Sequence, residues 1–220
     1  MPIASDELNL NAVLIAVSAA SRVAGRAAAE RSSLADLLKD DRSPVTVADL
    51  AVQVAVTAGM RAAGVPYADR LVGEEGSDSL DAGGSRMLEQ IIRLAGEALV
   101  DANLPEAAPT REAEVRELLD AGGLDPAAEG REVFWSLDPI DGTKGFLRGQ
   151  QFALALGLVE GDSPVVGFLG CPHLPLERVE DYGVADPIGS IYAGVVGEGA
   201  RAGDTNATGM ASLTPITVSP

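Results

Sequence analysis

The feature that most constrains the fold of this 220-residue chain is a helical hydrophobic pattern early in the sequence, followed by strand patterns later on. Early in the chain, apolar residues recur at helical spacing, as at Leu10, Val13, Leu14 and Val17. Later, short apolar runs bounded by glycine and proline are typical of strands. Helices followed by strands predict an α+β domain in which helices are layered on a mostly antiparallel sheet.

Helices are expected over residues 7–30, from the segment 45–49 to about 62, and over 85–103 and 111–119. Strands are expected over 71–73, 132–137, 152–159, 165–170, 190–196 and 214–218. Loops are expected over 76–84 and around 122–126, and a hairpin turn over 161–164. We find no internal repeat and no long linker, so a helical part, about 1–130, and a sheet-rich part, about 131–220, are assigned to one domain.

Composition indicates a folded chain with an acidic surface. The apolar fraction is 46% and the mean hydropathy is +0.15, whereas aromatic residues make up 4%, so the core must consist largely of Ala, Val, Leu and Ile. The net charge is −17, which disfavours binding to nucleic acids or anionic membranes. A small anionic substrate remains compatible with this charge, because a bound Mg²⁺ inverts the local field.

The lone cysteine and histidine limit other chemistries. Cys171 excludes an internal disulfide and is expected to be a free buried thiol in a reducing compartment. His173 has no histidine partner for a zinc site and is expected in a loop. We see no apolar run near the ~20 residues of a membrane span and no secretory signal, and we expect a cytoplasmic protein with organellar targeting left open. Oligomeric state is not predicted.

The segment 138–143 combines two aspartates, a proline, a glycine and a threonine directly after an apolar run. Such a loop can aim Asp138, Asp141 and a backbone carbonyl between them at one point, as hard divalent cations require. Asp-Pro and Asp-Gly are also common in turns, so the segment taken alone favours a structural turn.

Two further acidic positions, Asp49 and the pair Glu74-Glu75, also begin a helix or end an apolar segment. Each also has a structural explanation: Asp49 as an acidic residue that favours a helix start, and Glu74 and Glu75 as solvated residues at the end of a strand. If folding brings them to Asp138, the set suits phosphate ester hydrolysis, in which Mg²⁺ ions held by carboxylates activate a water and orient the phosphoryl group. A threonine hydroxyl can orient that water, and loop amides can bind phosphate oxygens.

Four segments carry a family resemblance: 45–49, 71–75, 134–149 and 167–172. They resemble the lithium-sensitive, magnesium-dependent phosphatase superfamily that includes inositol monophosphatase and fructose bisphosphatase. Within it, Lys144-Gly145-Phe146 is similar to the 3′(2′),5′-bisphosphate nucleotidases, where inositol monophosphatases tend to have Thr-Asn-Phe. The long connection between Glu74 and Asp138 also resembles the nucleotidases.

The resemblance implies roles for individual residues. The implied metal ligands for Mg²⁺ are Glu74, Asp138, the carbonyl of Ile140, and Asp141. The implied catalytic residues are Thr143 with Glu74, which position and deprotonate the attacking water, and Asp49, as a base or a ligand of an additional metal. Gly142 and Thr143 are the implied phosphate-binding residues, and Glu75 has a supporting role.

The resemblance further implies a fold like the N-terminal domain of these phosphatases and a small phosphorylated nucleotide as substrate. The implied reaction converts 3′-phosphoadenosine 5′-phosphate to AMP and phosphate, a step of sulfur metabolism. Family members continue well past this length and carry a later aspartate in a Trp-Asp motif, whereas Trp135 is the only tryptophan here. We therefore expect the second domain to be missing. Two alternatives stay open: an inositol phosphate phosphatase, and a truncated non-catalytic relative that binds metal or a partner.

Overall fold

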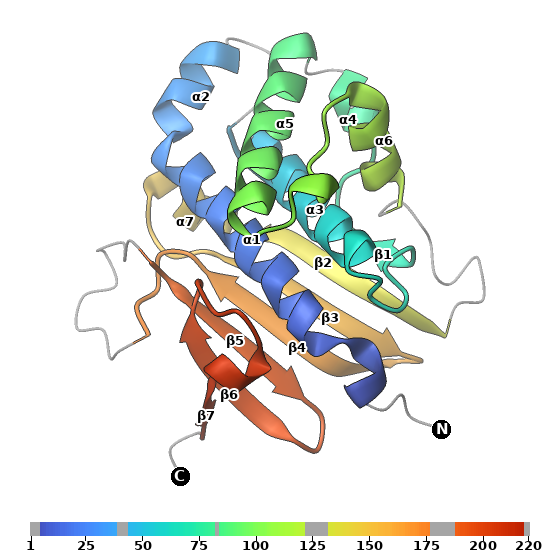
Figure 1. Cartoon of the computed structure of the whole chain (residues 1–220). Coiled ribbons are helices and arrows are strands. Elements are labelled where there is room, and N and C mark those ends of the chain that lie inside the picture. Colours follow the sequence, from blue (N-terminus) through green and yellow to red (C-terminus); the bar gives the residue numbers. More distant parts are fainter. Residues whose placement is uncertain (1–4, 39–43, 82–83, 122–131, 177–187, 218–220) are drawn as a thin grey trace.

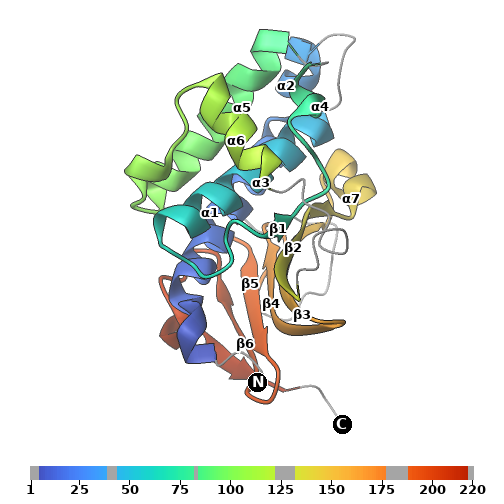
Figure 2. The same cartoon turned by 90° about the vertical axis from the view of Figure 1, so that its right-hand side faces the viewer.

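Helices cover one face of a single sheet (Figure 1). The computed structural model describes residues 5–38, 44–81, 84–121, 132–176 and 188–217. Viewed from the side, the long helices lie together on the same side of the strands (Figure 2). The α+β class predicted from the sequence is confirmed.

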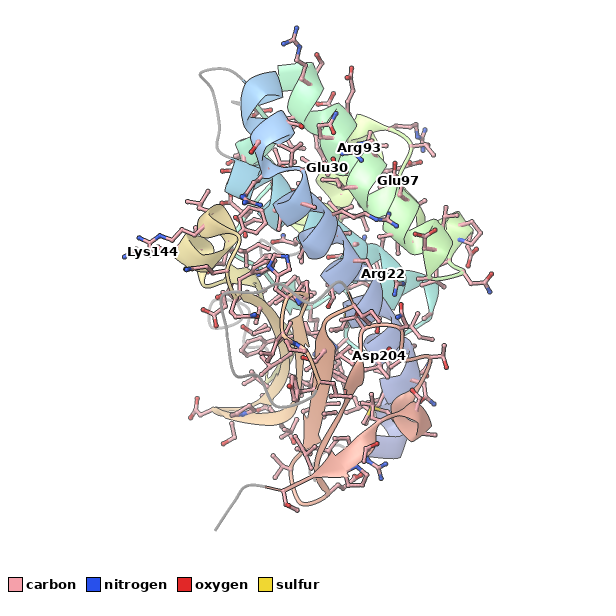
Figure 3. The ribbon with its side chains drawn as sticks, turned by 90° about the vertical axis from the view of Figure 1, so that its left-hand side faces the viewer. Arg22, Glu30, Arg93, Glu97, Lys144 and Asp204 are labelled. Carbon is pink, nitrogen blue, oxygen red and sulfur yellow. The ribbon has the colours of Figure 1, made fainter. Side chains whose placement is uncertain are left out.

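The helical layer contains three long helices and several short ones. Their bounds are α1 Leu10–Ala29, α2 Arg31–Leu38, α3 Pro44–Ala62, α4 Asp78–Asp81, α5 Gly84–Asp101, α6 Glu112–Asp120 and α7 Thr143–Arg148, with 3₁₀ turns η1 Ser5–Leu8, η2 Pro105–Ala107 and η3 Met210–Ser212. Arg93 on α5 forms ion pairs with Glu30 beside α1 and with Glu97 one turn along its own helix (Figure 3). The pair with Glu30 joins the outer helix to the end of α1.

The sheet has seven described strands, and their spatial order follows the chain order. The strands are β1 Leu71–Val72, β2 Val133–Asp141, β3 Ala153–Glu160, β4 Ser163–Cys171, β5 Ser190–Val195, β6 Gly199–Asp204 and β7 Thr214–Ile216. β1 is parallel to β2, and every other described pair is antiparallel. The predicted, mostly antiparallel sheet is therefore confirmed.

Helix α3 is the centre of the core. It is buried continuously from Val47 to Met60, because α1, α5, α6 and the sheet surround it. Close packing against α1 depends on small residues: a Cβ added at Gly59 would lie 3.1 Å from the Cβ of Ala16. Alanine-rich helices that pack this closely explain how a chain with 4% aromatic residues forms a core.

The face of the sheet away from these helices presents small residues. Register pairs Ser136 with Gly157, Gly157 with Gly167, Gly167 with Gly194, and Gly194 with Ala200, so residues with little or no side chain form one row across five strands. An apolar hollow of about 530 Å³ lies over this row, and Asp138 lines it too. The hollow thus borders the acidic segment of β2.

Several elements differ from the prediction. The expected loop 76–84 contains α4, and α2 follows a break at Glu30 that the helical pattern does not reveal. The helix expected over 7–30 is divided at Asn9, which has a left-handed conformation with φ of 48°. The expected loop around 122–126 lies outside the described residues.

The strand prediction missed β6 and shortened β2. The sequence of β6, Gly-Ala-Arg-Ala-Gly-Asp, has no β-branched residue, so it lacks a strand pattern. It is a strand because β5 and β7 satisfy its backbone groups from both sides. β2 continues past Leu137 to Asp141, so the acidic segment belongs to the sheet.

One helix in the described part of the chain, α1, is long and apolar enough to cross a membrane by length and composition. This corrects the expectation that no segment approaches that length. In the structure, 72% of its most apolar window is buried inside the molecule. Such burial is typical of a core helix.

Candidate functional site

The two motif aspartates lie on the same face of β2 although they are three residues apart. Side chains alternate along a regular strand, so residues at that spacing would point to opposite faces. Asp138 is paired with Ala155 and Asp141 with Ala153, and these alanines are two residues apart on β3. One extra residue is therefore inserted in β2, which is a β-bulge. The bulge includes Pro139, which has no N–H for the ladder.

Strand β1 brings a second acidic segment to the same place. It runs parallel to β2, with Val72 opposite Ser136. Two residues further along each chain lie Glu74 and Asp138, so the parallel pairing brings these carboxylates to one edge of the sheet. Burial raises the pKa of Glu74, and the charge of Asp138 raises it further.

Asp49 approaches this edge from the buried helix α3. Its side chain is 8% exposed. Burial, together with the charges of Glu74, Glu75 and Asp138, raises the pKa of its carboxyl group to about 7. The structure thus places the carboxylates from α3, β1 and β2 within electrostatic range of one another, although 89 positions separate Asp49 from Asp138.

Asp138 has an oxygen with no hydrogen-bond donor. Burial raises the pKa of its carboxyl group, the charge of Asp141 raises it further, and a hydrogen bond from the backbone N–H of Ile140 opposes these effects. Its Oδ1 atom is buried and accepts no hydrogen bond from any described residue. An orphaned buried oxygen requires an explanation, and an absent cation is one.

A sharp turn connects β2 to α7. Gly142 has φ of 88°, a left-handed conformation that glycine adopts without strain, and its carbonyl accepts hydrogen bonds from the N–H groups of Gly145 and Phe146. Thr143 is the first residue of α7, and its Oγ1 donates a long hydrogen bond, 3.4 Å, to the carbonyl of Ile140. The turn places the threonine hydroxyl beside the carbonyl that follows Pro139.

The Lys-Gly-Phe sequence has a structural basis in this turn. A Cβ added at Gly145 would lie 1.9 Å from the carbonyl oxygen of Gln151, so no larger residue fits without displacing the backbone. Phe146 is fully buried and its ring meets Phe152 edge-on at 5.2 Å. Lys144 projects from α7 away from the sheet (Figure 3). Glycine and phenylalanine thus fix the turn, and the lysine remains exposed.

The lone histidine and cysteine lie near this turn. The ring of His173 packs edge-on against Phe152 at 4.9 Å, and its Nδ1 lies 3.0 Å from the carbonyl of Gln150. His173 is outside any helix or strand, as predicted. Cys171 is a free buried thiol, also as predicted, and burial raises its pKa to about 11 with a contribution from Asp141.

The donor set of the site suits a hard cation. It consists of carboxylates and the carbonyl of Ile140, and the buried, unpaired Oδ1 of Asp138 would gain a partner from an ion. Among the described residues, no three His, Cys, Asp or Glu side chains converge enough to enclose an ion by themselves. Mg²⁺ keeps several waters and commonly takes one or two carboxylates, so the residues present fit it.

Sequence reasoning identified these acidic residues but missed a polar residue beneath them. Gln53 on α3 is fully buried, and its amide Nε2 donates to the backbone carbonyl of Glu75. The sequence contains one indication of it: Gln53 interrupts an apolar helical pattern four residues after Asp49. Its contact with the Glu74-Glu75 segment depends on the tertiary fold and is not visible in the pattern.

Comparison with known proteins identifies several relatives of this chain. A 3′(2′),5′-bisphosphate nucleotidase 1 of Candida albicans is 39% identical over 166 residues, which are 74% of this chain and 44% of that protein. The 3′(2′),5′-bisphosphate nucleotidase of Schizosaccharomyces pombe is 38% identical, with 79% and 48% covered. The 3′(2′),5′-bisphosphate nucleotidase 1 of Arabidopsis thaliana is 37% identical, and the match covers 73% of this chain and 46% of that protein. The chain thus spans about half the length of the curated relatives it matches.

Solved structures give the same fold. CysQ from Bacteroides thetaiotaomicron, described as a bacterial member of the inositol monophosphatase family, matches with a TM-score of 0.52 and 19% identity, covering 96% of this chain and 59% of that one. The inositol monophosphatase family model matches residues 9–215. Because that match includes α1, α3, strands β1 to β6 and every acidic residue of the site, the chain belongs to the inositol monophosphatase family.

Proposed function

We propose that this chain carries the acidic site of a Mg²⁺-dependent phosphomonoesterase that hydrolyses the 3′-phosphate of 3′-phosphoadenosine 5′-phosphate, giving AMP and phosphate. The observation that carries the proposal is the bulge in β2, which turns Asp138 and Asp141 to one face beside Glu74. The names of the relatives, 3′(2′),5′-bisphosphate nucleotidases, support the substrate.

Four groups would supply ligands for Mg²⁺, with no more than two carboxylates on any one ion because no three described side chains converge on a single point: the carboxylates of Glu74, Asp138 and Asp141, and the carbonyl of Ile140. The chemistry that the ion supplies when bound is polarisation of the phosphoryl group and a lowered pKa of water. The buried Oδ1 of Asp138 supports this assignment, because the described residues offer it no donor. The raised pKa values of Glu74 and Asp138 support it too, since a cation relieves the repulsion that Asp138 exerts on Glu74 and Asp141 on Asp138.

The remaining roles concern protons and the substrate phosphate. The Thr143 hydroxyl would orient the attacking water, and Glu74 would accept its proton. Asp49 is a second acceptor, because a carboxyl with a pKa of about 7 exchanges protons readily near neutral pH. The backbone N–H groups of Gly142 and Thr143 would bind oxygens of the phosphate that is removed.

Phosphate release from the purified 220-residue chain tests the proposal. With Mg²⁺, we expect turnover of 3′-phosphoadenosine 5′-phosphate, little turnover of inositol 1-phosphate, and inhibition by Li⁺. Asp138→Ala should abolish turnover. Ser136→Ala should preserve it, because Ser136 lies on the same face of β2 but is not assigned to the site.

Three outcomes contradict the proposal in different ways. Preferred turnover of the inositol phosphate would identify a different substrate class within the family. Turnover that survives in Asp138→Ala would place the chemistry elsewhere. Binding of Mn²⁺ without turnover of either substrate would identify a non-catalytic, metal-binding chain.

A further inference from the structure

Gln53 is a buried amide directly beneath the acidic site. It lies on α3, four residues after Asp49, so both side chains leave the same side of one helix. It is 0% exposed and is surrounded along α3 by buried apolar residues. A buried glutamine must be hydrogen-bonded to offset the loss of its hydration.

The amide of Gln53 joins three parts of the molecule. Its Nε2 donates to the backbone carbonyl of Glu75 at 2.8 Å and more weakly to that of Leu119, in α6, at 3.4 Å. The first acceptor belongs to the acidic segment that follows β1. The side chain therefore connects the helix that carries Asp49 to the segment that carries Glu74.

Gly73 makes room for this contact. A Cβ added there would lie 2.2 Å from Oε1 and 2.5 Å from Cδ of Gln53, closer than real Cβ contacts permit. The backbone just before Glu74 thus rests directly on the glutamine amide. Gln53 supports the segment on both sides of Glu74, at Gly73 by packing and at Glu75 by a hydrogen bond.

Filling the core does not account for an amide at this position. The Oε1 atom of Gln53 is buried and has no donor among the described residues, so the site leaves one polar group unpaired. A methionine or leucine would fill a similar volume without that cost. What the apolar side chains lack is the N–H that binds the carbonyl of Glu75.

We propose that Gln53 is a positioning residue that fixes the Glu74-Glu75 segment relative to Asp49, with Gly73 as its packing partner. This inference rests on the proposed function, in which Glu74 holds a metal ion. Residues behind a metal ligand orient it, and their loss typically lowers metal affinity about 10- to 100-fold. Gln53 acts through the backbone of the segment and touches neither ion nor substrate.

Mn²⁺ affinity of the full chain, measured by electron paramagnetic resonance or calorimetry, tests the inference without turnover. Gln53→Met keeps the volume and removes the donor, and we expect it to weaken Mn²⁺ binding about tenfold or more. The control is Thr57→Val, one turn further along α3, which removes a buried hydroxyl that donates to the backbone carbonyl of Gln53 within the same helix. Thr57→Val should bind Mn²⁺ like the wild type.

Gly73→Ala approaches the same contact from the other side. We expect it to weaken Mn²⁺ binding, because the new methyl group displaces the Gln53 amide. In a Gln53→Ala background, the shortened side chain leaves room, so Gly73→Ala should cause little further loss. This non-additivity is specific to a shared contact, and independent stability effects would add.

The two proposals fail in distinguishable ways. If the wild type releases no phosphate from any substrate but Gln53→Met weakens Mn²⁺ binding more than Thr57→Val, the proposed function fails and the positioning role holds. If Gln53→Met and Thr57→Val bind Mn²⁺ equally, or if Gly73→Ala has the same effect in both backgrounds, the positioning role is wrong. A wild type that binds no Mn²⁺ overturns both.

Discussion

Replacing Asp49 by asparagine should make the folded chain more stable, and increasingly so as pH rises. Asp49 is 8% exposed, and burial, together with repulsion from Glu74, Glu75 and Asp138, raises the pKa of its carboxyl group from an ordinary 3.8 to about 7. At a pH above the pKa of Asp49, the native state must hold a carboxylate charge in a poorly hydrated site beside other carboxylates. Asparagine has a similar shape and carries no charge at any pH.

The size of the effect follows from the two protonation equilibria. Between pH 3.8 and about 7 the native chain retains a proton that the unfolded chain has lost, and this stabilisation disappears as pH rises through about 7. A shift of about 3 pKa units, at about 1.4 kcal/mol for each unit, corresponds to about 4 kcal/mol. The unfolding free energy of Asp49→Asn relative to the wild type should therefore rise by up to about 4 kcal/mol from pH 4 to pH 8.

Urea denaturation in EDTA, repeated across this pH range, measures the difference. Trp135, the only tryptophan, is fully buried and its indole N–H donates to the carbonyl of Pro66 at 3.0 Å, so its fluorescence reports unfolding. Asp162→Asn, in the exposed turn between β3 and β4, controls for the loss of one negative charge. A difference between Asp49→Asn and the wild type that changes by less than about 1 kcal/mol over these pH values would refute the assigned burial and repulsion.

Two further predictions test packing. In the same urea assay, Gly170→Ala on β4 should destabilise the chain by about 1–3 kcal/mol, because the new Cβ would lie 2.0 Å from the Ser21 hydroxyl. Gly167→Ala on the same strand places its methyl group in open space, so it should change the unfolding free energy by less than about 0.5 kcal/mol. An equal loss in both variants would contradict this assignment of the two sheet faces. Burial raises the pKa of the Cys171 thiol from 9.0 to about 11, so fewer molecules carry the reactive thiolate at pH 8. Its reaction with a disulfide reagent should therefore be at least about 100-fold slower in the folded chain than in urea. Equal rates would show that the thiol is accessible in the folded chain.

The layered fold was largely predictable because its elements have strong local patterns. The α1 and α3 regions repeat apolar residues at helical spacing, and β3 and β4 are bounded by glycine and proline. β6 was not predictable, because its Gly-Ala-Arg-Ala-Gly-Asp sequence has no preference for a strand and depends on its neighbours. Prediction from the local sequence pattern fails where pairing with neighbouring strands, rather than the residues' own strand propensity, determines the structure.

The acidic residues of the site were recognisable as types, but their arrangement was not. A spacing of three between Asp138 and Asp141 indicates a turn as readily as a metal site, and the bulge that places both on one face appears only in the register with β3. Likewise, the contact between Gln53 and Glu75 spans 22 residues and has no periodic signal. Both features depend on long-range pairing, which a single sequence does not encode in local composition.

The same pairing creates a conflict between stability and function at this edge of the sheet. Burial and repulsion from neighbouring carboxylates raise the pKa of Asp49, Glu74 and Asp138, and for the buried Asp49 this lowers the stability of the metal-free fold above a pH of about 7. In a chain of net charge −17, solvated acidic residues would avoid this cost by lying apart on the surface. Three separate elements, α3, β1 and β2, instead hold them together, and a buried Oδ1 of Asp138 remains without a donor. A bound cation would offset the repulsion and give the buried Oδ1 of Asp138 a partner, which is the physical argument for the proposed metal site.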